Sequence, residues 1–125
     1  MIDIGLSFAA SGANARYLLR GLSTIAEDPI GRGLNIKLLR VLFFLYGEPD
    51  CAADLTRIIL ALDLSGSFMS RAGETFVALG LIHREPGFDN RRIVIFRLTD
   101  RGVAFCERIA EIFTAREEDV PNAIR

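Results

Sequence analysis

Residues 80–102 read GLIHREPGFDNRRIVIFRLTDRG, and no other stretch of the chain constrains its architecture more. A short apolar opening at 80–82 leads into a polar, turn-rich middle that carries two adjacent arginines, Arg91 and Arg92. A second apolar run follows at 93–98. Two strand-like runs around residues typical of turns predict a β-hairpin. The arginines place positive charge at its tip.

Five helices are expected around this hairpin from apolar spacing and capping residues. The ranges are 11–27, 36–46, a third that follows Asp50 and runs to Leu62, 67–79, and a last one from Thr99 to Glu118, before Pro121. The expected N-caps are Asn35, Asp50, one of Ser65 and Ser67, and Thr99. A first short strand is expected near 47–50.

This order of elements predicts an α+β fold, mostly α, of the winged helix-turn-helix type. A hairpin with a cationic tip beside a helix-turn-helix is the arrangement of a DNA reader. We expect an N-terminal helix and loop at 1–34, the winged helix-turn-helix at 35–100 and a C-terminal helix at 101–125. The two terminal segments are expected to serve dimerisation.

Composition is compatible with this interpretation. The chain has 125 residues, of which 50% are hydrophobic and 25% charged, so it is expected to fold as one domain. A net charge of −1 argues against an indiscriminate nucleic-acid binder, but residues 64–101 carry six arginines against four acidic residues. Lys37 is the only lysine. Arginine favours bidentate contacts with phosphate and guanine, although a GC-rich genome produces the same bias.

Other classes of protein find little support. Cys51 and Cys106 form neither a disulfide framework nor a zinc motif and are expected to be buried structural thiols. His83 is the only histidine, and no phosphate-binding glycine loop or metal motif is present, so we expect no enzyme, no metal and no cofactor. The N-terminus is a poor signal peptide and no apolar run reaches membrane-spanning length. We expect a cytoplasmic, nucleoid-associated bacterial protein.

Several segments, taken in order, resemble the MarR family of winged-helix transcriptional regulators. They are IKLLRVLFFLYGEP at 36–49, ADLTR at 53–57, LSGSFMSR at 64–71, ALGLIHRE at 78–85, NRR at 90–92 and LTDRG at 98–102. The resemblance implies a dimeric regulator of transcription, often with a pocket for a small aromatic effector. Three positions depart from the pattern: Asn90 replaces the usual wing aspartate, Gly66 replaces a common proline, and Gly73 lies within the recognition helix.

Candidate DNA-contacting residues lie in the expected recognition helix and in the hairpin tip. In the helix they are Ser65, Ser67, Phe68, Ser70, Arg71 and Thr75. Hydroxyls at a helix N-terminus suit phosphate, arginine suits guanine or phosphate, and an apolar side chain suits a thymine methyl. Helix capping for the serines and core packing for Phe68 remain alternatives. At the tip, one of Arg91 and Arg92 is expected in the minor groove and the other on phosphate, and the family register implies Arg92 for the groove.

The terminal helices carry more apolar surface than the core of one domain requires. The candidate dimer-interface residues are Leu18, Leu22, Phe105, Ile109, Ile112 and Phe113. A two-fold dimer presents two recognition helices to a pseudo-palindromic operator. The alternative is that both helices only cover the core of their own domain.

The function expected from these features is sequence-specific binding of double-stranded DNA by a homodimeric regulator. A small-molecule effector fits this scheme, but nothing in the sequence identifies one. The alternative is a winged helix that docks other proteins without specific DNA binding. Acidic residues on the recognition-helix surface would favour that alternative, and Glu74 is the only acid there.

Overall fold

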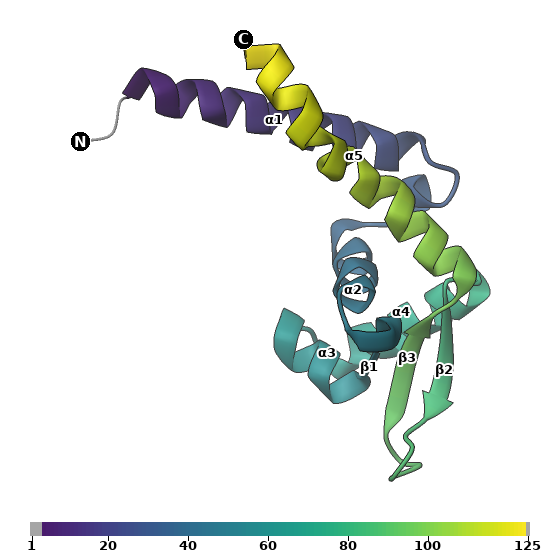
Figure 1. Ribbon diagram of the computed structural model, residues 1–125. Helices are drawn as coiled ribbons and strands as arrows, with labels where there is room; N and C mark the ends of the chain where they lie inside the picture. The colour runs from purple at the N-terminus through teal and green to yellow at the C-terminus, as the bar shows by residue number, and fades with distance from the viewer. Residues whose placement is uncertain (1–3, 125) are drawn as a thin grey trace. The chain divides into compact units, whose positions relative to one another are not determined.

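A computed structural model describes the backbone of residues 4–124 and the side chains of residues 11–112. The elements are α1 (Ile4–Glu27), η1 (Gly31–Gly33), α2 (Ile36–Tyr46), η2 (Pro49–Cys51), β1 (Ala52–Asp54), α3 (Leu55–Leu62), α4 (Gly66–Ala78), β2 (Ile82–Pro86), β3 (Val94–Leu98) and α5 (Asp100–Ile124) (Figure 1). Two compact units form. One contains the segments up to Arg32 and from Glu107 onward, and the other contains Gly33–Cys106. Within the described residues, no helix is both long and apolar enough to cross a bilayer.

The second unit contains the predicted hairpin in a three-stranded antiparallel sheet of order β1-β3-β2. Phe96 lies at its centre, opposite Ala53 of β1 and Arg84 of β2, and its side chain is buried. The β2–β3 hairpin projects beyond the helices of its unit (Figure 1). The sequence prediction of a mostly helical fold with a winged hairpin is confirmed.

Arg97 hydrogen-bonds to groups on both sides of its strand in the three-stranded sheet. Its Nε and Nη2 donate to the Glu85 carboxylate at 2.9 and 3.1 Å, and its Nη1 donates to the backbone carbonyl of Asp50 at 3.2 Å. The hydrogen bond from Arg97 lowers the pKa of Glu85 below its ordinary value. One side chain on β3 therefore connects both the outer strand β2 and the turn before β1.

Helix α2 begins at its predicted cap and packs against α5. Asn35 caps α2, its side-chain oxygen accepting from the backbone N–H of Leu38 at 2.9 Å, as predicted. The Phe43 and Phe105 rings lie 6.3 Å apart, which brings α2 against the first turns of α5. The largest fully buried side chains of the unit are Val41, Leu42, Leu45, Ile58, Met69, Phe76, Leu81, Phe105 and Cys106. Apart from Leu81, which lies between α4 and β2, they come from α2, α3, α4 and α5, so each α-helix of the unit contributes to its core.

The prediction that Asp50 caps the third helix is wrong. Asp50 and Cys51 both have positive φ, so the chain turns through η2 at this point instead of entering a helix. The first strand lies at Ala52–Asp54, not near 47–50, because this segment pairs with β3. Asp54 then caps α3, accepting from the backbone N–H of Arg57 at 2.8 Å.

Three element boundaries also differ from the predictions. Helix α1 begins at Ile4 rather than at residue 11, because the alanine-containing segment before residue 11 continues the helix. Helix α5 extends to Ile124 instead of ending at Glu118, since Pro121 removes one backbone donor only in the final turns. The first hairpin strand begins at Ile82, because residues 79–81 form the turn between α4 and β2.

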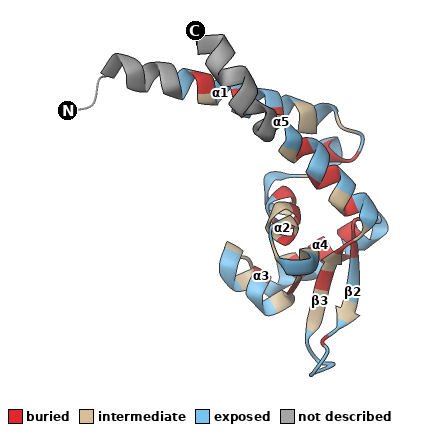
Figure 2. Cartoon of the chain, in the orientation of Figure 1, coloured by how far each residue is buried: buried red, intermediate tan, exposed pale blue. Residues whose placement is uncertain are grey.

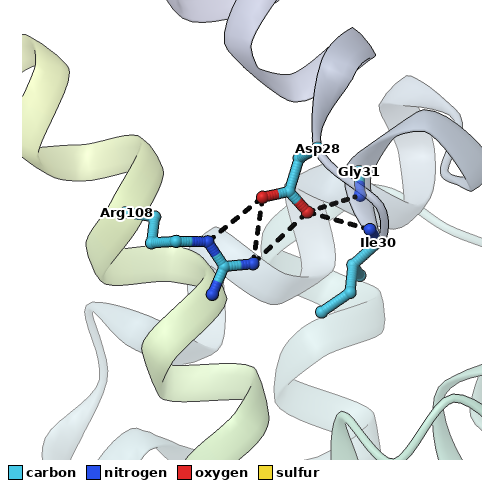
Figure 3. Close-up of polar contacts among 4 residues, drawn as sticks. All are labelled: Asp28, Ile30, Gly31 and Arg108. Carbon is cyan, nitrogen blue, oxygen red and sulfur yellow. Dashed lines mark hydrogen bonds and ion pairs between the residues drawn. The ribbon is translucent and has the colours of Figure 1, made fainter.

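In the first unit, Asp28 joins the end of α1 to α5 (Figure 3). Its Oδ2 accepts from Nε and Nη2 of Arg108 at 3.1 and 3.0 Å, and its Oδ1 accepts from the backbone N–H groups of Ile30 and Gly31 at 2.8 and 3.1 Å. Burial alone raises the pKa of Asp28, but these hydrogen bonds outweigh it, and the pKa falls below its ordinary value of 3.8.

We predict that Asp28→Asn lowers the free energy of unfolding by about 1 kcal/mol at neutral pH, because Arg108 loses a charged partner while remaining half exposed. A carboxyl with a lowered pKa stabilises the fold above its unfolded pKa and ceases to do so as pH falls through the folded pKa. Denaturant unfolding at several pH values should therefore show the two proteins converging below pH 3.8. A difference that persists undiminished in acid would show that charge is not its origin.

Candidate nucleic-acid interface

The start of α4 is organised by a serine cap. Ser65 accepts from the backbone N–H of Phe68 at 3.0 Å, and the Ser65 and Ser67 hydroxyls lie 3.2 Å apart. Ser65 therefore acts as the N-cap, which was one of the two predicted possibilities. Ser67 is exposed in the first turn, where backbone N–H groups favour an anion such as phosphate.

Helix α4 has one buried face and one exposed face. Met69, Ala72, Gly73 and Phe76 are buried. Ser67, Ser70, Arg71, Glu74 and Thr75 are exposed at three-to-four spacing and make up the α4 outer row. Within this row the Thr75 hydroxyl donates to the backbone carbonyl of Arg71 at 3.2 Å. Four predicted DNA-contacting residues thus share one exposed face.

Phe68 and Lys37 form a contact that sequence reasoning missed. Phe68 is half-buried, and the Nζ of Lys37 lies 5.6 Å from the centroid of its ring. Nearby on α2, Arg40 donates to the backbone carbonyl of Leu62 at 3.1 Å. Two cations of α2 therefore lie beside the approach to α4. No spacing pattern relates residue 37 to residue 68, so only the fold reveals the pair.

Gly73 allows α4 to approach the sheet closely. A Cβ at this position would lie 2.9 Å from Cζ of Phe96, a ring that is itself buried at the centre of the sheet. The helix-weakening glycine seen in the sequence is therefore a packing requirement. It sets the distance between α4 and the strand that leads out of the wing.

We predict that Gly73→Ala destabilises the protein by about 1 kcal/mol, because overpacking against Phe96 exceeds the gain in helix propensity. Gly66→Ala in the first turn of the same helix is the matched control, since a Cβ there meets no heavy atom within 4 Å. Thermal unfolding of both variants measures the difference. A stabilised Gly73→Ala variant would contradict the packing role.

The tip of the wing is a closed turn at 87–93. The backbone N–H of Gly87 donates to the carbonyl of Ile93 at 2.8 Å, and the N–H of Ile93 donates to the carbonyl of Asn90 at 3.1 Å. The Asn90 side-chain oxygen accepts from the backbone N–H of Arg92 at 3.0 Å. The Asn90 amide thus orders the backbone beside the arginines. Arg91 and Arg92 are both exposed.

The two cysteines differ in their surroundings. Cys106 is buried, with its Sγ 3.7 Å from the backbone carbonyl of Leu42, and burial raises the pKa of its thiol to about 12. Such a thiol is a poor nucleophile. Cys51 is only half-buried, which departs from the prediction, because it lies in the η2 turn with positive φ. The part of the chain that the structure describes contains no cluster of three potential metal ligands.

The candidate dimer residues fall into three groups. Leu18 and Leu22 on α1 are 56% and 52% exposed, and Leu19 beside them is also exposed. Phe105 and Ile109 are already buried within the single chain, and Ile112 is half-buried. The Phe113 side chain lies outside the described residues. The exposed candidates are therefore the α1 leucines.

Several solved structures share the fold of this chain. Rv1404 from Mycobacterium tuberculosis has a TM-score of 0.77 and 20% identity over 99% of this chain and 81% of its own. AbsC, a MarR family transcriptional regulator from Streptomyces coelicolor, has a TM-score of 0.63 and 17% identity over 93% of this chain and 78% of its own. The chain has the MarR-type winged-helix fold.

MepR of S. aureus, solved as a complex with DNA, shares this MarR-type fold at a TM-score of 0.67 and 18% identity. The match covers 95% of this chain and 90% of MepR. No protein-family model and no curated protein matches the chain. At these identities the similarity establishes the MarR-type fold and assigns no functional residue.

Proposed function

We propose that this protein is a transcriptional regulator that binds a specific double-stranded DNA sequence as a homodimer. The observation that carries the proposal is that one compact unit exposes both the α4 outer row and a closed, arginine-bearing wing. MepR, which shares the fold, has been solved bound to DNA.

The proposed contacts follow from the chemistry of the two exposed surfaces. Helix α4 lies in the major groove, where Arg71 reaches guanine or phosphate and Ser67 and Ser70 hydrogen-bond phosphates or base edges. Of the wing arginines, Arg92 enters the minor groove and Arg91 binds phosphate. Lys37 adds a phosphate contact beside the start of α4.

The homodimer is proposed to form through the exposed α1 leucines. Leu18, Leu19 and Leu22 place apolar surface on one stretch of α1 that the single chain does not cover. A two-fold axis through such a surface would repeat α4 and the wing on the second half of an operator. Binding to a pseudo-palindrome follows from this symmetry.

Selection from a random duplex pool tests both specificity and symmetry. The proposal predicts enrichment of two inverted half-sites whose centres lie about one helical turn apart, on the order of 10 base pairs. Leu18→Asp/Leu22→Asp should reduce the protein to a monomer and abolish enrichment of the paired half-sites. A pool without any common sequence after repeated rounds would contradict specific recognition.

A winged helix that only docks other proteins is a weaker candidate. Such a role favours acidic side chains on the recognition helix, and Glu74 is the one acid of the α4 outer row.

A further inference from the structure

We propose that Phe88, in the wing tip, is a DNA-contacting residue whose ring wedges into the minor groove beside the wing arginines; this contact presupposes the proposed DNA binding. Phe88 is 99% exposed, more than any other large hydrophobic side chain among the described residues. Its ring therefore contributes nothing to the core of its own unit.

Exposure alone does not assign a role, because single apolar side chains are common on protein surfaces. The position of Phe88 in the wing is the observation that supports a role in binding. It follows Gly87 directly, where the Gly87–Ile93 hydrogen bond closes the turn. In Figure 2 the loop beyond the paired strands is largely coloured as exposed, at the end of the hairpin farthest from the helices of its unit. The ring is thus presented by an ordered turn at a projecting end.

The tip carries two exposed arginines against one exposed acid, Asp89, and this balance favours a nucleic acid as the partner. Arg91 and Arg92, three and four residues further on, are exposed and attract the phosphates that border a minor groove. Proteins that bind the minor groove combine such cations with apolar side chains that insert between base steps. Phe88 supplies the apolar part of this combination, which the arginines alone lack.

A hollow of about 290 Å³ beside the wing is lined by more acidic than basic side chains. Its lining includes Phe88, Ile93 and three acidic residues, Asp50, Asp54 and Asp89. Its one cation, Arg97, is engaged with Glu85 and the Asp50 carbonyl. Carboxylates repel phosphate, so the side of the wing is unsuited to a duplex. Arg91 and Arg92 do not line this hollow, so the duplex is expected to approach from the arginine side of the tip. Phe88 lines the hollow but is 99% exposed, so its ring is accessible from that side.

The test compares wild type with Phe88→Ala, Phe88→Leu and Leu60→Ala on a duplex enriched from a random pool. Leu60 on α3 is 77% exposed and outside the wing, so it controls for loss of an exposed apolar side chain. Fluorescence anisotropy at several salt concentrations gives affinity and salt dependence. Energy transfer between dyes at the duplex ends gives bending, which wedge residues typically cause by about 20–90°.

Phe88→Ala should weaken binding about tenfold with an unchanged salt slope, since no charge is lost. It should also reduce the bend, and Phe88→Leu should restore most of both effects. Leu60→Ala should behave as wild type. Equal affinity and equal bending for Phe88→Ala and wild type would overturn the wedge and leave the ring as a docking point for another protein. Failure of wild type itself to bind DNA would overturn the proposed function together with the wedge.

Discussion

Gly102→Ala is expected to lower the free energy of unfolding by about 3 kcal/mol, the largest stability effect we predict for a single methyl group. Gly102 lies in the first turn of α5 and is buried. A Cβ at this position would collide with the backbone carbonyl oxygen of Leu81 and lie 3.2 Å from Cδ2 of Leu98. That oxygen already accepts from the backbone N–H of Thr99 at 3.0 Å, so it cannot move without breaking the bond.

The same region explains why the collision is costly. The Thr99 hydroxyl accepts from the backbone N–H of Gly102 at 3.0 Å and donates to the carbonyl of Gly80 at 2.6 Å. Thr99 thereby caps α5, as predicted. Through its hydrogen bond to Gly80 it also holds the turn that follows α4. Displacing residue 102 would disturb this cap and the entry to β2 together.

Thermal unfolding measures this prediction, with an expected fall in melting temperature on the order of 10 °C. Gly12→Ala in α1 is the matched control, because a Cβ there meets no heavy atom within 4 Å. This control should be neutral or slightly stabilising through helix propensity. Equal melting temperatures for Gly102→Ala and wild type would show that the close approach to Leu81 is not required.

Arg91→Ala/Arg92→Ala is expected to weaken DNA binding by about 10- to 100-fold while leaving the melting temperature unchanged. Both side chains are exposed at the wing tip and support no core contact, so the loss should be confined to binding. The slope of log affinity against log salt should become shallower by about 0.9 for each phosphate contact removed.

The matched control for the wing is Arg16→Ala/Arg32→Ala, which removes the same charge from the other unit. Anisotropy titrations should show wild-type salt dependence for this control. If both double variants lost affinity equally, the effect would come from net charge and not from the wing.

Capping residues and apolar runs predicted much of the fold, because helix starts and the hairpin depend on interactions between residues close in the sequence. Asn35, Ser65 and Thr99 each accept from a backbone N–H three residues further on, as capping residues in the sequence indicate. The hairpin followed from two apolar runs around a turn. The prediction of a cap at Asp50 is wrong because a long-range contact, the β1–β3 pairing, determines the backbone conformation of this segment.

The candidate interface was predicted less completely, because part of it depends on contacts between residues far apart in the sequence. The sequence predicted Ser67, Ser70, Arg71 and Thr75 as DNA contacts, and the structure places all four on one exposed face of α4. The Lys37–Phe68 contact and the exposure of Phe88 depend on tertiary structure, and no sequence period indicates them. Phe105 is likewise buried within its own unit, where its ring lies against Phe43, and apolar spacing alone does not indicate this contact.

The most direct test of the central claim is the binding of wild-type protein to a duplex from upstream of its own gene, compared with a scrambled duplex. Fluorescence anisotropy at two salt concentrations is sufficient. We predict tight binding to the first duplex, at least about 1000-fold weaker binding to the second, and affinity that falls as salt rises. Equal and weak binding to that duplex, to the scrambled duplex and to a pool-enriched duplex would contradict the account of α4 and the wing as a sequence-reading surface.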